Sequence, residues 1–289
     1  MSSWRIPAKT FLIGEYIALS GGPAILLTSE PCFELSLVDD AILPFHPHSP
    51  AGRFCVQHQL DRRLVWHDPY GGLGGLGASS AEFVASFYAY CDVYQRSFCL
   101  DELLEMYWAY ASKKGQRPSG YDVMAQTLHA CVMIHQTKKQ RYVMSWPFDD
   151  IGFILVHTKH KLPTHQHLQE ARFSDLETSD LYRIAESAWA SFEMHSSEGL
   201  TQAIHAYHLA LGRMMLVAHT TMLMIETLNH EIKPLAIKGC GALGADVVIM
   251  IVEQSRFTMV KTVLQEKNYT ILATSEKLYE LKHEKMLEI

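Results

Sequence analysis

The sequence contains little of what marks a membrane or secreted protein. Its longest apolar run near the C-terminus, VVIMIV at residues 247–252, is far too short to span a bilayer. The N-terminal residues MSSWRIPAKTF include no apolar segment of the kind found in signal peptides. We therefore expect a soluble, cytoplasmic protein with no membrane partner.

Metal-binding or redox cysteine pairs and an excess of basic residues are also absent. The six cysteines, at positions 32, 55, 91, 99, 131 and 240, form no C-x-x-C motif, which favours reduced, buried thiols. None of the sixteen histidines lies in H-E-x-x-H or zinc-finger spacing, so no transition-metal site is predicted. The net charge of -6 argues against nucleic acid as a partner.

Hydrophobic periodicity predicts an α+β protein of two lobes. Of the 289 residues, 48% are hydrophobic and 19% charged, which suffices for a packed core. Strand-like runs occupy residues 11–14, 24–28, 33–38, 53–57 and 63–67, and helical spacing follows at 83–94, 100–114 and from 122 through 132. After residue 150 the pattern predicts strands at 152–157, 235–238, 246–252 and 269–274, with helices at 178–194, 200–230 and 256–266. The predicted lobes are residues 1–150 and 151–289.

The stretch GGLGGLGASSAEF at residues 71–83 has five glycines among its first seven residues. It contains the dinucleotide-binding pattern G-x-G-x-x-G, but a helix, not a second strand, follows the next helix, so the context disfavours a Rossmann fold. A glycine turn that opens a helix is an anion site because the first N–H groups and the helix dipole face the ligand. The alternative is a plain capping box formed by Ser79 and Glu82.

Three motifs occur in order along the chain, at residues 7–25 (PAKTFLIGEYIALSGGPAI), 75–81 (GLGASSA) and 237–246 (IKGCGALGAD). They resemble the motifs of the GHMP kinases, the family of galactokinase, homoserine kinase, mevalonate kinase and phosphomevalonate kinase. The resemblance implies a lobe like ribosomal protein S5 domain 2 followed by a ferredoxin-like lobe. It also implies ATP and magnesium (Mg²⁺) as cofactors. The residues that it implies for ATP binding are Gly74, Gly75, Leu76, Gly77, Ala78, Ser79 and Ser80, with Ser79 or Ser80 as the metal ligand.

A fourth stretch, RPSGYDVMA at residues 117–125, is similar to the P-S-G-x-D stretch of the mevalonate-type branch. The resemblance implies Asp122 as the catalytic base and Lys9 as the residue that stabilises the transferred phosphoryl group. On local sequence alone, Asp122 is also a plausible helix cap. The residues implied for substrate binding are Glu15, Tyr16, Ser119, Gly120, Gly241 and Ala242. For Glu15, a bracing role beside the tight turn is the alternative.

Several positions depart from the family pattern. Ala111 stands where mevalonate kinases carry a metal-binding glutamate, and Leu243 and Ala245 replace two glycines of the last motif. Tyr16 and Asp246 are similar to the phosphomevalonate kinases. Basic residues near the motifs suggest an anionic acceptor, with a solvated basic surface as the alternative. These residues are Arg5, Lys113, Lys114 and Arg117. Lys159, Lys161 and Thr164 lie in a stretch, residues 157–168, that looks like the mevalonate-kinase stretch at the start of the second lobe.

We therefore expect an ATP-dependent kinase that phosphorylates phosphomevalonate or mevalonate, as a monomer or homodimer. The alternatives are an enzyme like diphosphomevalonate decarboxylase, a kinase for another small hydroxylated acid or sugar, and a nucleotide-binding regulator without turnover. A nicotinamide-dependent oxidoreductase is a more distant alternative.

Overall fold

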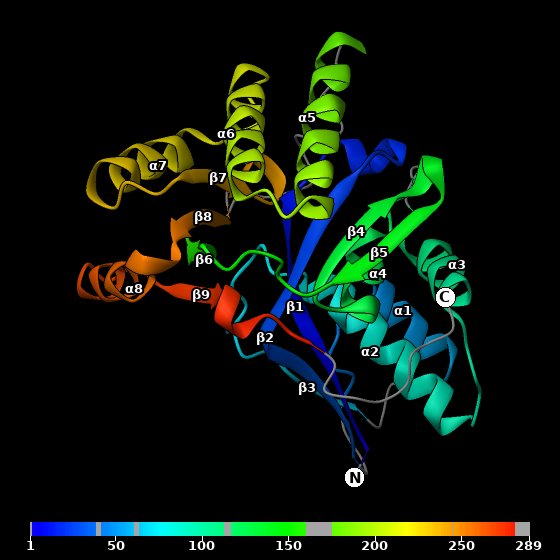
Figure 1. Ribbon diagram of the computed structural model, residues 1–289. Coiled ribbons are helices and arrows are strands. Elements are labelled where there is room, and N and C mark those ends of the chain that lie inside the picture. The colour runs from blue at the N-terminus through cyan, green and yellow to red at the C-terminus, as the bar shows by residue number, and fades with distance from the viewer. Residues whose placement is uncertain are drawn as a thin grey trace.

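Two antiparallel sheets, each covered by helices, make up the fold in the computed structural model (Figure 1). The structure describes residues 2–38, 42–60, 64–112, 117–159, 175–244 and 246–280. The mixed composition of helices and strands confirms the predicted α+β class. In the described part of the chain, no helix is both long enough and apolar enough to cross a bilayer.

The first sheet is organised around one long strand. Strand β2 (Ala24–Leu37) pairs with β1 (Ser3–Ile13) along most of its length, with β4 (Cys131–His135) near its start and with β3 (Leu64–His67) near its end. Strand β5 (Gln140–Met144) completes the sheet beside β4. Strand β1 lies at one edge of this sheet and contacts a strand and a helix of the second half of the chain, so the first sequence motif lies where the two halves meet.

Helices α1 (Pro50–Gln57), α2 (Ala78–Val93), α3 (Leu100–Ala111) and α4 (Tyr121–Leu128) gather on one side of this sheet (Figure 1). Helix α2 lies at the centre, against β1, β2, α1 and α4. It is buried around most of its circumference, as expected for a helix between other helices and a sheet. Its N-terminus is thereby fixed at the end of the glycine stretch.

The second sheet has the strand order β7-β8-β6-β9 and is antiparallel throughout. Its strands are β6 (Ile151–His157), β7 (Ala236–Cys240), β8 (Val247–Glu253) and β9 (Ile271–Thr274). With the first and third strands of the lobe in the centre, this is the ferredoxin-like arrangement that was predicted.

Both faces of the second sheet are buried. Helices α7 (His219–Glu231) and α8 (Phe257–Glu266) cover one face, and side chains such as Val248 and Met250 pack beneath them. The alternate residues Val247 and Ile249 join the main core, on the side of α5 (Asp175–Glu193) and α6 (Ser197–Arg213). Burial on both faces explains why residues 247–252 form a continuous apolar run.

Three predicted elements were wrong. Residues 53–57 belong to helix α1, which begins with Pro50 after the N-cap Ser49, whose hydroxyl accepts the N–H of Gly52. Residue Val132 lies in β4, because His129 and Ala130 adopt positive φ and end helix α4. The predicted helix at 200–230 is two helices, separated by residues 214–218.

The strands divide between the sheets on either side of residue 150, but contacts cross that position. Helix α5 packs against β2 of the first sheet. Near the end of the described chain, the N–H of Tyr279 donates to the carbonyl of Thr28 and the carbonyl of Tyr279 accepts from Ala130. The two predicted lobes are therefore tied together by more than the single connection at residue 150.

Candidate active site

A cleft of about 450 Å³ collects residues from all three motifs and from the P-S-G-x-D stretch. It lies where β1, the start of α2, the start of α4 and the turn before β8 meet. Its lining includes most of the predicted site residues: Lys9, Glu15, Tyr16, Gly74, Gly75, Gly77, Ala78, Ser79, Ser119, Asp122 and Gly241. The structure thus brings together side chains that are more than 200 positions apart in the sequence.

The glycine loop is fastened to the first sheet at its centre. Leu76 is only 1% exposed and its carbonyl accepts the N–H of Lys9 at 3.0 Å. On either side, Gly75 and Gly77 have φ of 84° and 78°, a conformation that side-chain-bearing residues rarely adopt. The buried leucine holds the loop in place while the flanking glycines turn its backbone toward the cleft.

Helix α2 begins at Ala78 with Gly77 as its N-cap and without a side-chain cap. The capping-box alternative is therefore wrong, because Ser79 already lies inside the first turn. The N–H groups of that turn and the positive end of the dipole of a 16-residue helix favour an anion at this position.

The two serines that the sequence could not separate occupy different environments. Ser79 is exposed and lines the cleft. Ser80 is 5% exposed, and its hydroxyl donates to the carbonyl of Gly77 at 2.9 Å. Of the two, Ser79 is the one with its side chain in the cleft.

Lys9 and Asp122 face each other at the base of the cleft. Lys9 is 8% exposed on β1, and its Nζ lies 2.9 Å from Oδ1 of Asp122. Helix α4 is capped by Gly120, at φ 77°, and has no side-chain cap. The interpretation of Asp122 as a helix cap is therefore wrong: its carboxylate forms an ion pair with Lys9 inside the cleft.

Gln126, which the sequence analysis did not single out, holds this region together. It is fully buried on α4, one helical turn after Asp122. Its Nε2 donates to the carbonyl of Pro7 at 2.9 Å and to that of Gly77 at 3.1 Å. One side chain thus fixes the strand that carries Lys9, the end of the glycine loop and the helix that carries Asp122.

Glu15 and Lys238 form a buried ion pair between the first and third motifs. Lys238, on β7, has no exposed surface, and Glu15 is 7% exposed. The second carboxylate oxygen of Glu15, Oε2, has no hydrogen-bond partner, although the residue lines the cleft. Glu15 therefore braces the fold, and its Oε2 is buried without a partner in a residue that lines the cleft. Lys238 stood within a recognised motif, but only the tertiary structure assigns it a partner.

Tyr16 is the centre of a strained turn. Its φ of 72° and ψ of −53°, with a hydrogen bond from the N–H of Ile17 to the carbonyl of Glu15, are those of a γ-turn of the rare kind. The carbonyl of Glu15 also accepts the hydroxyl of Tyr207 at 2.6 Å. Burial raises the pKa of Tyr16 to about 12, so its side chain is a neutral phenol at neutral pH.

The third motif closes the other side of the cleft. Gly241 lines the cleft with φ 87°, and Leu243 adopts φ 55° within the short helix Ala242–Gly244. Leu243 packs against the core instead of lining the cleft, so this replacement of a glycine does not fill the site. Ala242 lies in the same turn, and Ala245 falls outside the described residues.

The basic residues that suggested an anionic acceptor are not gathered in the described part of the cleft. Arg5 lies 3.8 Å from Glu30, Arg117 stacks on the ring of Trp108, and Lys159 donates to the carbonyl of Asn268. Lys113, Lys114, Lys161 and Thr164 fall outside the described residues. Within those residues, Lys9 is the one cation that lines the cleft.

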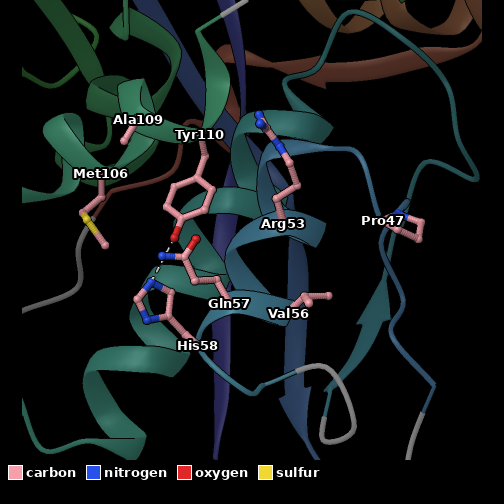
Figure 2. Close-up of a pocket in the computed structure, with 8 residues that line it drawn as sticks. All are labelled: Pro47, Arg53, Val56, Gln57, His58, Met106, Ala109 and Tyr110. Atoms are coloured by element: carbon pink, nitrogen blue, oxygen red, sulfur yellow. Dashed lines mark hydrogen bonds between the residues drawn. The ribbon is translucent and has the colours of Figure 1, made fainter.

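A second, larger hollow of about 670 Å³ lies between α1 and α3. Figure 2 shows Arg53, Val56 and Gln57 extending from α1, and Met106, Ala109 and Tyr110 from α3. The hydroxyl of Tyr110 lies 3.2 Å from Nε2 of His58 (Figure 2). None of the three motifs contributes to this hollow, so we place the candidate active site in the smaller cleft.

The residues that line the cleft suit a nucleoside triphosphate with Mg²⁺. Added methyl groups at Gly74 and Gly77 would come within 2.8 Å of Asp246 and Lys9, so only glycine allows this close approach of the loop to charged side chains. The N–H groups at the start of α2 and the amine of Lys9 suit phosphate, and hydroxyl and carboxylate oxygens suit Mg²⁺. The described residues hold no cluster of three or more His, Cys, Asp or Glu side chains, but Mg²⁺ commonly keeps waters and uses phosphate oxygens.

No protein-family model and no curated protein matches the sequence. Solved structures do match the fold. Mevalonate kinase from Methanococcus jannaschii superposes with a TM-score of 0.74 over 96% of this chain and 98% of that one, at 12% identity.

Phosphomevalonate kinase from Streptococcus pneumoniae, in complex with phosphomevalonate and AMPPNP, gives a TM-score of 0.76 over 95% of this chain and 99% of that one, at 14% identity. Galactokinase from Lactococcus lactis, complexed with galactose, gives 0.72 over 96% and 93%, at 10% identity. The predicted resemblance is thus confirmed at the level of structure, and the chain has the fold of the GHMP kinases.

Proposed function

We propose that this protein is an ATP-dependent kinase that phosphorylates a small molecule in the cleft. The observation that carries the proposal is the Lys9–Asp122 pair, with 2.9 Å between Nζ and Oδ1, directly below the glycine loop. Phosphoryl transfer needs mainly positioning and charge neutralisation, and this arrangement offers both.

Each group has a distinct role in this chemistry. The loop N–H groups at the start of α2 bind phosphate oxygens of the nucleotide. Lys9 neutralises charge on the transferred phosphoryl group and orients the carboxylate of Asp122. Asp122 accepts the proton of an acceptor hydroxyl. Ser79, whose side chain lines the cleft, would help to hold Mg²⁺, which would supply charge neutralisation for the nucleotide phosphates.

We propose mevalonate or phosphomevalonate as the acceptor. A mevalonate kinase and a phosphomevalonate kinase are structural neighbours over 96% and 95% of this chain, and Tyr16 and Asp246 are similar to the phosphomevalonate kinases. The two acceptors place different demands on Asp122. The hydroxyl of mevalonate must lose a proton, whereas the phosphate of phosphomevalonate is already ionised at neutral pH because its second pKa is about 6.

The test is release of ADP by the purified protein with ATP and Mg²⁺, with mevalonate, phosphomevalonate, galactose and homoserine offered separately. We expect turnover on one of the first two, and loss of at least about 100-fold in Asp122→Asn if the acceptor is a hydroxyl. A smaller loss is expected for a phosphate acceptor. The matched control is Asp101→Asn, because Asp101 is also ion-paired, with Arg141, but lies on α3 outside the cleft.

The other outcomes identify the alternatives. Nucleotide binding without ADP release on any acceptor would contradict the kinase proposal and favour a regulator. Release of CO₂ together with ADP, when diphosphomevalonate is offered as a fifth compound, would favour a decarboxylase. Turnover on galactose or homoserine alone would keep the kinase and overturn the acceptor.

A further inference from the structure

The carboxylate of Asp246 lies directly against the glycine loop. A methyl group at Gly74 would come within 2.8 Å of its Oδ1, and one at Gly75 within 2.7 Å of its Cβ. A methyl group added at Gly241 would lie 3.4 Å from Oδ2 of Asp246. Asp246 lines the cleft, and its carbonyl is held by the N–H and the hydroxyl of Thr158. The third motif therefore places an acidic side chain beside the loop that suits phosphate.

This position has an electrostatic consequence. Among the described residues, the charged side chains that line the cleft are one lysine, Lys9, and three carboxylates: Glu15, Asp122 and Asp246. Lys238 lies behind Glu15, with which it forms a buried ion pair. A polyphosphate that enters beside Asp246 meets like charge in a partly desolvated site, where repulsion is stronger than in water. A divalent cation between the two would convert that repulsion into attraction.

The chemistry of the surrounding donors agrees with a cation at this place. The exposed hydroxyl of Ser79 and the carboxylate of Asp246 lie at the two ends of the glycine loop, and both are hard oxygen donors of the kind that Mg²⁺ prefers. Glu15, whose buried Oε2 has no hydrogen-bond partner, also lines the cleft. Helix α3 ends at Ala111 and contributes no carboxylate to the cleft lining.

We propose that Asp246 is the protein carboxylate that binds the divalent cation accompanying the nucleotide, and that it makes nucleotide binding depend on that cation. The inference rests on the proposed function, because it assumes that a nucleotide enters the cleft. It goes beyond that function by assigning the metal ligand to the third motif, where the sequence analysis assigned no metal role.

The test measures binding rather than turnover. The affinity of the full-length protein for a non-hydrolysable ATP analogue is determined by calorimetry with and without Mg²⁺. Binding of Mn²⁺ in the presence of the analogue is followed by the electron paramagnetic resonance signal of the unbound ion. In the wild type we expect Mg²⁺ to increase nucleotide affinity at least 10-fold. In Asp246→Asn we expect the Mg²⁺-dependent gain in nucleotide affinity to fall several-fold. We also expect the metal-free analogue to bind more tightly than to the wild type, and the affinity for Mn²⁺ to be lower by at least about 10-fold.

Two further variants make the result specific. Glu253→Gln removes the same charge from the exposed far end of β8 and should match the wild type. Ser79→Ala should lower the affinity for Mn²⁺ without raising the affinity for the metal-free analogue, because it removes a metal ligand but no charge. An unchanged metal gain in Asp246→Asn, with the analogue still bound, would overturn the role of Asp246 and leave the kinase proposal standing. Failure of the wild type to bind the analogue under any condition would overturn both.

Discussion

The hydroxyl of Tyr16 accepts a hydrogen bond of 2.9 Å from the backbone N–H of Leu243, and both residues have positive φ. This bond joins the strained turn of the first motif to the strained turn of the third. Strained residues persist where the surrounding structure fixes them, and such sites cluster at functional positions. The Tyr16–Leu243 bond is therefore one of the contacts that hold the two walls of the cleft at a fixed separation.

Tyr16→Phe should lower the free energy of unfolding by about 1–2 kcal/mol, because the N–H of Leu243 loses its acceptor in a partly buried place. Nucleotide affinity should fall as well, since the third motif is no longer fixed against the first. Urea denaturation and calorimetry measure the two effects. Tyr94→Phe is the control: its exposed hydroxyl also bonds to backbone, at His58, but far from the cleft. Equal losses in both variants would argue against the coupling of the walls.

Gly77→Ala should impair nucleotide binding more than Gly72→Ala. The two glycines have similar φ, 78° and 82°, so the backbone strain of the substitution is nearly the same. At Gly77 the added methyl group would also meet Cε of Lys9 at 2.8 Å, whereas at Gly72 nothing lies within 4 Å. The methyl group would also lie 3.1 Å from Nε2 of Gln126, so the difference between the variants reports displacement of Lys9 together with that of Gln126. Calorimetric titration of the nucleotide measures it, and identical affinities in the two variants would contradict the predicted contact.

Lys238→Met should destabilise the protein by about 3–5 kcal/mol, because it leaves the charge of Glu15 buried without its partner. The double variant with Glu15→Gln should recover a large part of this loss, since no buried charge remains. Guanidinium denaturation of the two single variants and the double variant gives the coupling energy. Strict additivity of the single effects would mean that the buried pair contributes no interaction of its own.

Glu82→Gln should stabilise the protein at pH 8 and have little effect at pH 5. Burial, and to a lesser extent the charge of Asp68, raises the pKa of Glu82 from its ordinary value of 4.5 to about 7. Between these values the folded state binds more protons than the unfolded state, so stability falls as pH rises through this range. Glutamine resembles the protonated form and avoids the loss, which amounts to about 1–2 kcal/mol after allowance for partial exposure.

Thermal unfolding of wild type and Glu82→Gln across pH 5–8 tests this expectation. The difference between the midpoints should grow with pH. A constant difference would show that Glu82 does not titrate in this range. Asp68→Asn should produce a smaller shift in the same direction, because its charge is the lesser cause, although it also leaves one acceptor oxygen in place of the two that bind the N–H groups of Tyr70 and Gly72.

The sequence by itself determined which backbone segments carry the chemistry. Glycines at 75 and 77, the pattern around Lys9 and the S-G-x-D stretch before Asp122 are local signals, because each depends on a turn conformation or a helix start that a few residues specify. Most strands and helices were likewise predictable from the period of the hydrophobic residues and from the Gly, Pro and Asp residues that interrupt it. The prediction of a strand at residues 53–57 was wrong because a short amphipathic helix and a short strand give similar hydrophobic patterns.

Only the tertiary structure decided which side chains meet. Ser79 and Ser80 are neighbours in sequence, yet the rotation of α2 exposes one and buries the other. Lys238 and Glu15 are 223 positions apart, and their pairing depends on how β7 packs beside the first motif. The position of Asp246 against Gly74 has the same origin. Such contacts arise from the packing of two sheets and their helices, which no local sequence pattern encodes.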